Sequence, residues 1–425
     1  MGAVGKTGRM RRRLPGVAAT VLACALVAGC SGSSDAAGDG GGVGASSSDA
    51  TAAATAGPTA EEFTGSGDFY AEPDPLPEGD HGALIRYQVL ADANVSGTTA
   101  YRIMYLSESV AGDPIAVTGT VLVPTAAAPG DGRRILTIAH GTTGIADECA
   151  PSKNPRATEM ALMSPFVEQG YLIAESDYEG LGTPGRHPYL VGESEGRSVL
   201  DAALAAGQLP DAHAGDRMAI FGYSQGGHGA LWAGQLAEDW TPDLELVGTV
   251  AGAPATELPV IFAAAGRLPI AGFLYMIIAG FNQAYPDAPL DKVLTPQGEQ
   301  ELDAVDQGCV GQVIRRFAGE DSSALLTPDA ATVEPWATLA KENDPGNVAT
   351  ASPILIVHSA ADDVVPAALS DLLFKRMCGL GQVVERRVYD KGRGHGQAVP
   401  DAVTDGFAWI QQRFAGDPPT NTCPS

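Results

Sequence analysis

Residues Gly222-Tyr223-Ser224-Gln225-Gly226-Gly227 lie between two segments with different hydrophobic patterns. The apolar run 218–221 before them is typical of a buried strand, and the alanine-rich segment 229–238 after them is typical of a helix. A G-x-S-x-G pattern between a strand and a helix predicts a sharp turn that holds Ser224 out over the sheet edge. We call this turn, residues 222–227, the elbow. Glycine is needed on both sides because a Cβ there would collide with the neighbouring strand or helix. The alternative is a strand-to-helix loop that only requires small residues.

Strands and helices alternate along the chain before this turn. Three stretches rich in β-branched and aromatic residues, separated by turn signals, predict antiparallel strands at 84–90, 101–107 and 115–123. A buried strand then runs from Arg134 into the loop His140-Gly141-Thr142-Thr143-Gly144, and the pattern continues with a helix at 158–169, a strand at 171–176 and a helix at 194–206. This alternation predicts an α/β fold with a mostly parallel central sheet and helices on both faces.

The alternation stops after a strand at 246–251. Residues 254–351 are rich in Ala, Pro, Gly and Asp and contain helix-like patches, including an apolar run at 268–281 that is too short to span a bilayer. We interpret this region as a helical cap inserted over the active-site face. The alternation then resumes with a strand at 354–358, a helix at 367–377, a strand at 383–389 and an amphipathic helix at 398–414.

A serine hydroxyl needs a base that accepts its proton and a carboxylate that orients the base. In the α/β-hydrolase fold these partners follow the serine in the order acid, then histidine. Beyond Ser224 the chain has only His228, His358 and His395. We interpret His228, one turn along the elbow helix, as a packed helix residue, and we predict that His395, in a glycine-rich loop after a strand, is the general base.

The acid is expected in Ser359-Ala360-Ala361-Asp362-Asp363-Val364-Val365-Pro366, which follows the strand that ends at His358. A carboxylate three residues before Val365-Pro366 has the usual spacing, which favours Asp362. Asp363 is the alternative, and it could instead cap the following helix. Asp177 and Asp390 also end strands, but they do not fit the expected order or position, so we interpret them as structural.

Hydrogen-bond donors must also face the oxyanion that develops during acyl transfer. The backbone N–H of Gln225, the residue after the nucleophile, is the first expected donor. The second is expected from the loop that begins at His140, with the N–H of Thr142 as the first candidate and that of Thr143 as the alternative. His140 itself is interpreted as a structural residue of this loop.

The N-terminus carries the pattern of an export signal. Basic residues precede an apolar stretch at 14–28, and Leu26-Val27-Ala28-Gly29-Cys30 resembles a lipobox, in which Cys30 becomes the lipidated first residue. Ordinary cleavage near Ala28 is the alternative. We therefore expect a signal peptide at 1–29, a flexible Ser/Gly/Ala-rich tether at 30–65 and a hydrolase domain at 66–425, outside the cytoplasm and anchored to the cell membrane or secreted.

Charge and cysteine content agree with an exported protein. The formal net charge of −25 and the pI near 4.5 argue against a nucleic-acid partner. The cysteines beyond the signal and lipobox are even in number and are expected to form two disulfides in an oxidising compartment, in one of three pairings: Cys149, Cys309, Cys378 and Cys423. No feature demands a metal or an organic cofactor, and the oligomeric state is left open.

Together the motifs resemble the secretory lipase family of α/β-hydrolases, which includes fungal lipase A and many bacterial lipoproteins. The resemblance covers roughly residues 80–425 and depends on motifs spread along that range. These are the loop that begins at His140, called the oxyanion loop, followed by Cys149-Ala150-Pro151-Ser152; Ser176-Asp177-Tyr178-Glu179-Gly180-Leu181-Gly182; the elbow; Asp362 with Val365-Pro366; Cys378-Gly379-Leu380-Gly381; His395; and a closing Phe414-Ala415-Gly416-Asp417-Pro418-Pro419 before Cys423. It implies a mobile cap and the pairings Cys149 with Cys309 and Cys378 with Cys423. Two features depart from the family pattern: the oxyanion loop is rich in threonine, and Ser359 occupies a place often held by Gly.

The leading functional hypothesis is hydrolysis of carboxylic esters, with acylglycerols as the expected lipid substrates and the region 268–281 lining or covering the acyl site. A serine peptidase or a polyester hydrolase would use the same three residues. The alternative from another class of function is a surface lipoprotein that binds lipids or a partner without catalysis.

Overall fold

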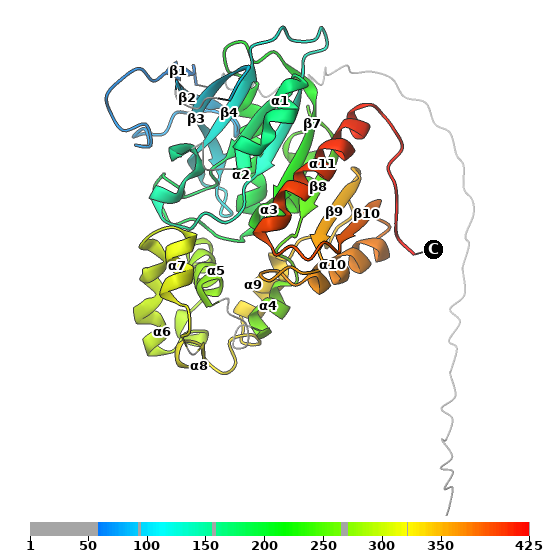
Figure 1. Ribbon diagram of the computed structural model, residues 1–425. Helices are drawn as coiled ribbons and strands as arrows, with labels where there is room; N and C mark the ends of the chain where they lie inside the picture. The colour runs from blue at the N-terminus through cyan, green and yellow to red at the C-terminus, as the bar shows by residue number, and fades with distance from the viewer. Residues whose placement is uncertain (1–57, 92–94, 155–158, 265–270, 321, 425) are drawn as a thin grey trace, which may run out of the picture. The chain divides into compact units, whose positions relative to one another are not determined.

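A single sheet organises the computed structural model, which describes residues 58–91, 95–154, 159–264, 271–320 and 322–424. Within these residues ten strands follow the order β1-β2-β3-β4-β6-β5-β7-β8-β9-β10 (Figure 1). All described residues belong to one compact unit, Ala54–Ser425. The predicted signal peptide and lipobox, with Cys30, lie outside the described residues.

The first strands form an antiparallel group, as the turn signals predict. β2 (Leu84–Val89), β3 (Thr98–Glu108) and β4 (Pro114–Pro124) pair in order, and β4 then pairs antiparallel with β6 (Leu172–Ser176). This group forms one side of the sheet and leaves the other side to the parallel strands.

The parallel strands carry the predicted site residues at their carboxyl ends. β6, β5 (Arg133–Ala139), β7 (Ala214–Tyr223), β8 (Glu245–Gly252), β9 (Ile354–Ser359) and β10 (Val384–Tyr389) are neighbours in that order and all pair in parallel. The expected α/β-hydrolase fold with a mostly parallel sheet is therefore confirmed. Because parallel strands end at the same edge, residues far apart in sequence meet there.

Helices cover both faces of the sheet, and strand side chains alternate between them. On one face Ile135 and Ile220 belong to the core under α2 (Gly192–Ala206) and α3 (Gln225–Trp240), with α10 (Ala367–Gly379) on the same side over β9. On the other face Leu136 and Phe221 pack under α1 (Ser164–Glu168) and α11 (Val399–Phe414).

The helix expected at 158–169 is shorter than predicted. A 3-10 turn, Glu159–Met163, precedes α1, which begins at Ser164. Pro165 explains the boundary because it has no N–H to donate to the preceding turn, so a continuous α-helix cannot run through it. In contrast, α3 begins at Gln225, four residues before the expected start, directly after the elbow serine.

The cap region is helical, as expected. It contains α4 (Leu258–Ala264), α5 (Ala271–Ala284), α6 (Pro296–Glu301), α7 (Val310–Arg316), α8 (Ser322–Leu325) and α9 (Trp336–Glu342), and Figure 1 shows α5 to α8 gathered beside the sheet. The predicted apolar run corresponds to α5, whose described part buries Leu274, Met276 and Ile278 in a separate core of the cap that includes Trp336. No helix within the described ranges is both long enough and apolar enough to cross a membrane.

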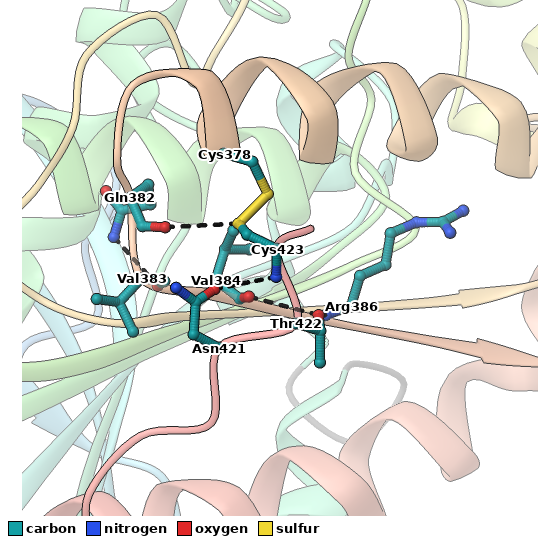
Figure 2. Close-up of a disulfide and its surroundings, with 8 residues drawn as sticks. All are labelled: Cys378, Gln382, Val383, Val384, Arg386, Asn421, Thr422 and Cys423. Carbon is teal, nitrogen blue, oxygen red and sulfur yellow. Dashed lines mark hydrogen bonds between the residues drawn. A yellow bond between two sulfur atoms is a disulfide. The ribbon is translucent and has the colours of Figure 1, made fainter. Parts of the chain in front are cut away.

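Both disulfides have the pairing that the family resemblance implies. Cys149–Cys309 joins the segment after the oxyanion loop to the residue before α7, and Cys378–Cys423 joins α10 to the C-terminal tail. Figure 2 shows the tail beside β10, where the Thr422 N–H donates to Val384 O and the Arg386 N–H donates to Thr422 Oγ1, both at 3.0 Å. The tail therefore uses backbone groups at the edge of the sheet that would otherwise be open to another strand.

Described residues before residue 66, the expected start of the hydrolase domain, already belong to the sheet. Glu61–Glu62 forms β1, which pairs in parallel with β2, and the Phe63 N–H donates to Tyr87 O at 2.7 Å. Phe63 also packs edge-on against Phe69, with ring centroids 5.5 Å apart. The end of the segment predicted as a tether is thus part of the sheet, and Phe63 holds it there.

Candidate active site

The elbow has the strained geometry that the G-x-S-x-G pattern predicts. Ser224 has φ 62° and ψ −119°, a conformation that L residues rarely adopt, and lies between the last residue of β7 and the first of α3. A Cβ at Gly222 would lie 1.9 Å from Gly226 O, and one at Gly226 would lie 1.9 Å from Ala139 O. Only glycine fits at either position, so the alternative of an ordinary small-residue loop is insufficient.

His395 and Asp362 form a hydrogen-bonded pair next to the elbow. His395 Nδ1 lies 2.7 Å from Asp362 Oδ2, and Oδ1 of the same carboxylate accepts the N–H groups of Val364 at 2.9 Å and Val365 at 2.8 Å. The Asp362 side chain is fully buried, whereas that of His395 is 13% exposed. Burial alone would raise the pKa of Asp362, but hydrogen bonds from His358, His395 and Val364 outweigh it and hold the pKa below its usual range.

His358 is part of this arrangement, although the sequence marks it only as the end of a strand. Its ring is buried, with Nε2 2.9 Å from Val365 O and 3.3 Å from Asp362 Oδ2. The Asp362 carboxylate therefore lies between two imidazoles, one that faces the cavity and one inside the core. The spacing of His358 four residues before Asp362 was visible in the sequence, but the contact depends on how the loop folds back over β9.

The loop that carries His395 is fixed by three further contacts. Ser359 Oγ donates to Arg393 O, the His395 N–H donates to Asp363 Oδ1 at 2.8 Å, and the Tyr223 hydroxyl donates to His395 O at 2.8 Å. Ser359, which departs from the family pattern, thus holds the histidine loop. Asp363 does not cap α10 as considered above, since Pro366 precedes that helix and Asp363 binds the His395 backbone instead.

Two of the predicted oxyanion residues line the same cavity as Ser224, and the third follows Ser224 in the chain. Gln225 is the first residue of α3, so its backbone N–H has no acceptor within the helix. Thr142 and Thr143 line a cavity together with Ser224 and His395. Thr142 Oγ1 is 2.8 Å from the Tyr189 hydroxyl, and Thr143 O accepts the Val310 N–H at 2.7 Å, so the loop is fixed to the cap.

Two cavities meet at Ser224 and differ in polarity. One, of about 290 Å³, includes the oxyanion loop and His395. The other, of about 280 Å³, is almost entirely apolar and lies under the cap, lined by Tyr189, Leu190, Ala255, Val260, Ile261, Ala264, Phe273, Ile277, Val364, Val365, Pro366 and Leu369. We call these the open lobe and the apolar lobe, and Phe273 and Val364 line both. A larger open cavity of about 730 Å³, near the amino ends of β5 and β7, contains none of the predicted site residues.

The remaining predicted residues have structural contacts. Asp177 is buried and accepts hydrogen bonds from the Ser152 N–H at 2.8 Å and from Thr118 Oγ1 at 2.6 Å, while burial raises its pKa. Asp390 is exposed after β10. His140 is buried, with its ring 3.2 Å from Asp177 O, and burial lowers its pKa. His228 is buried in α3 as expected, but its ring belongs to a polar network described below.

The chain is similar to several known lipases. A secreted triacylglycerol lipase of Malassezia globosa is 25% identical over 82% of this chain and 80% of its own length. A probable inactive lipase of Mycobacterium tuberculosis is 25% identical over 76% of this chain and 75% of its own. The structure of Candida antarctica lipase A superposes with a TM-score of 0.70 at 22% identity, over 81% of this chain and 84% of that one. The family model for secretory lipases matches residues 155–422, and the chain therefore belongs to the secretory lipase family.

Proposed function

We propose that the protein hydrolyses carboxylic esters through an acyl-enzyme on Ser224, with His395 as the base and Asp362 as its orienting carboxylate. The observation that carries this proposal is the His395–Asp362 pair, at 2.7 Å, beside the cavity that Ser224 also lines. Membership of the secretory lipase family supports the same reaction class.

The proposed reaction has two steps of the same kind. Ser224 Oγ attacks the ester carbonyl carbon while His395 Nε2 takes the hydroxyl proton, and the oxygen that becomes negative is bound by the N–H of Gln225 and that of Thr142 or Thr143. The tetrahedral intermediate then collapses, the C–O bond to the alcohol breaks, and His395 returns the proton to the leaving alcohol. Water repeats the sequence on the acyl-enzyme, releases the carboxylic acid and restores Ser224.

The two lobes suggest how an ester would lie. The apolar lobe under the cap offers a hydrocarbon surface to the acyl chain, whereas the open lobe has room for the alcohol and for water. We propose lipid esters, and acylglycerols in particular, as substrates. The triacylglycerol lipase name of the Malassezia relative supports this substrate class.

We also propose export and anchoring through a lipid on Cys30, because the basic N-terminus, the apolar stretch and the lipobox occur in the required order. The full chain, expressed in its host, should partition into the membrane fraction. Cys30→Ala should release it or block its processing. An unchanged membrane fraction for that variant would contradict the anchor without affecting the proposed reaction.

The reaction is tested with purified mature protein and p-nitrophenyl esters of increasing acyl length. Wild type should hydrolyse them and should be labelled by a fluorophosphonate. Ser224→Ala should lose labelling and about 10⁶-fold in kcat, as for other triad serines. Activity that survives in this variant would disprove the role of Ser224.

A non-catalytic lipid-binding protein is the second candidate, since one relative is named a probable inactive lipase. That function predicts a folded wild type that binds lipid but neither reacts with the fluorophosphonate nor hydrolyses any ester of the series.

A further inference from the structure

A second histidine–carboxylate pair, His228 and Glu195, lies behind the elbow and takes no part in the chemistry described above. We propose that Glu195 is a positioning residue of the acyl-transfer site: its carboxylate accepts hydrogen bonds from Gln225 and Leu190 and is itself held by the buried ring of His228. This inference rests on the proposed ester hydrolysis. It assigns a role to a carboxylate that lacks contact with the reacting atoms.

Glu195, on α2, uses both carboxylate oxygens. Oε1 accepts the Leu190 N–H at 3.0 Å and the Gln225 side-chain amide at 2.9 Å, and Oε2 lies 2.6 Å from His228 Nδ1. The side chains of Glu195 and His228 are fully buried. A buried carboxylate without such partners would be strongly unfavourable, so these three contacts are what allow Glu195 to lie here.

Through Gln225 the network reaches the oxyanion donor. The Gln225 side-chain nitrogen also lies 2.9 Å from His187 Nε2, while His187 Nδ1 donates to Glu179 O at 2.9 Å. Burial lowers the pKa of His187 to about 4, so its ring is neutral and Nε2 accepts. Both amide hydrogens of Gln225 therefore have acceptors. This fixes the residue whose backbone N–H is to bind the oxyanion.

Through Leu190 the network reaches the apolar lobe. Leu190 has φ 58°, a left-handed conformation that is unfavourable for a residue with a Cβ, and it lines that lobe. The hydrogen bond from its N–H to Glu195 helps to keep it there. One carboxylate oxygen thus binds a residue of the oxyanion site and a residue of the expected acyl site.

The contacts of His228 decide the protonation of the pair. Nε2 lies 2.8 Å from Asn343 O, a backbone carbonyl that can only accept, so Nε2 must donate. Nδ1 faces a carboxylate oxygen at 2.6 Å, so a second proton must lie between Nδ1 and Oε2. The pair is therefore held by one proton between the ring and the carboxyl group and by one proton that Nε2 donates to Asn343.

Asn343 extends this pair into the cap. Its carbonyl also accepts the Trp232 indole N–H at 3.0 Å, and its Oδ1 accepts the Gly192 N–H at 2.9 Å. Tyr178, whose hydroxyl donates to His140 O at 3.0 Å, lies beside the pair, and the other ionisable groups near it include His140, His187, Tyr189 and Asp344. Burial favours the neutral forms of the two histidines and Tyr189, and Asp344 is paired with Arg376 at 2.8 Å, so none competes for His228.

The first test is NMR of the ¹⁵N-labelled mature protein, with the His228 ring assigned by its loss in His228→Gln. In wild type the ring should carry the Nε2 proton, and a second proton should lie between Nδ1 and Glu195 Oε2. In Glu195→Gln the amide can donate to Nδ1, so the second proton should be lost and only the Nε2 proton kept. Absence of the second proton in wild type, or its presence in Glu195→Gln, would overturn the hydrogen bond between His228 and Glu195.

The second test compares Glu195→Gln with Glu195→Ala on p-nitrophenyl esters, with kcat expressed per site titrated by the fluorophosphonate. Glu195→Gln keeps acceptors for Leu190 and Gln225 and should stay within about 10-fold of wild type, whereas Glu195→Ala should lose about 100-fold in kcat. KM for an acetyl ester should change little, since that substrate does not reach Leu190.

The outcomes separate this inference from the proposed function. Wild type without labelling or activity would reject the ester-hydrolase proposal, whereas an active wild type matched by Glu195→Ala in kcat per titrated site would reject only the positioning role. Equal losses of kcat in Glu195→Gln and Glu195→Ala would also reject the positioning role, because the hydrogen-bond acceptors that Glu195→Gln keeps would then have no effect on kcat. If Glu195→Ala does not fold, Glu195→Gln must still show retained kcat and the altered His228 ring.

Discussion

His395–Asp362 and His228–Glu195 are nearly identical as isolated pairs. Each places imidazole Nδ1 against a carboxylate oxygen, at 2.7 Å and 2.6 Å respectively, and both carboxylates are fully buried. Each carboxylate also accepts hydrogen bonds from backbone N–H groups. The geometry of the pair therefore does not distinguish a base from a structural bridge.

The difference lies in the other ring nitrogen. His228 Nε2 donates to Asn343 O, and the ring is sealed between α3 and the end of the cap. Nε2 of His395 has no hydrogen bond to the described part of the chain, and its side chain lines the open lobe beside Ser224. A histidine can carry a proton between substrate and nucleophile only if that nitrogen is free, so access of Nε2 to the cavity distinguishes His395 from His228.

The same substitution on the two carboxylates should give very different results. Asp362→Asn should lower kcat by about 10⁴-fold, because an amide in place of the carboxylate favours the wrong tautomer of the catalytic imidazole. Glu195→Gln should stay within about 10-fold, since its histidine transfers no proton in the reaction. Steady-state kinetics on one short ester measure both, and similar losses would remove the distinction between the pairs.

Asp363→Asn is the matched control within the same loop. Asp363 accepts only the His395 backbone N–H, a contact that an amide oxygen can also accept, so we expect at most about a 10-fold loss. A larger loss than in Asp362→Asn would reverse the assignment of the acid.

The sequence predicted most of this site because each element depends on local patterns. Gly222 and Gly226 around Ser224 predict the elbow, and chain order selects Asp362 and His395 among the candidates. The strand and helix alternation predicts the parallel sheet that brings these loops to one edge. Each of these inferences follows from backbone constraints or from order along the chain.

The missed residues act through contacts that no local pattern encodes. His358 and Glu195 contact Asp362 and His228 only after β9, α2 and α3 have packed, and Ser359 reaches Arg393 across two loops. The observed helix boundaries differ from the predicted ones where a single residue overrides the hydrophobic pattern of the segment, as Pro165 does at the start of α1. The two lobes depend on side chains from the cap and the core together, so their volumes could not be predicted from the sequence.

Substitution of His358 tests whether the contact on the buried side of Asp362 contributes to activity. His358→Phe removes a ring nitrogen that donates to Val365 O at 2.9 Å and also lies 3.3 Å from Asp362 Oδ2, and it should lower kcat by about 10-fold, because the weaker contacts to a charged group contribute about 1.5 kcal/mol. The stronger negative charge left on Asp362 should also shift the acid limb of kcat/KM to higher pH. His358→Gln, which can still donate, should restore both values towards wild type. An unshifted pH profile in His358→Phe would indicate that its role is limited to packing.

The pH dependence of wild-type activity should depend on one titrating group. The pKa of Asp362 is held below its usual range, so the carboxylate stays ionised over the whole range in which an imidazole titrates. Protonation of a single group should then inactivate the enzyme on the acid side, and log kcat/KM should fall with a slope of about 1 per pH unit. Glu195→Gln should keep that slope. A slope near 2 would mean that a second group titrates with activity.

A third pair, His81–Asp201, shows the same contact away from both lobes. His81 Nδ1 lies 2.6 Å from Asp201 Oδ1, and the ring packs on Trp240 with centroids 4.1 Å apart. Burial lowers the pKa of His81, but the contact with Asp201 outweighs it, so the pKa is raised. The charge on His81 therefore stabilises the fold fully below the unfolded value of about 6.5, and this contribution is lost as pH rises through the folded pKa.

His81→Phe keeps a ring against Trp240 but removes the charge. Its free energy of unfolding in urea should fall below wild type by about 1 kcal/mol at pH about 6, and the gap should narrow at pH about 9. Activity per titrated site should not change, since His81 contacts neither lobe. A gap that widens with pH would mean that His81 stabilises the fold as a neutral ring, so a short His–carboxylate contact would not by itself indicate a charged pair.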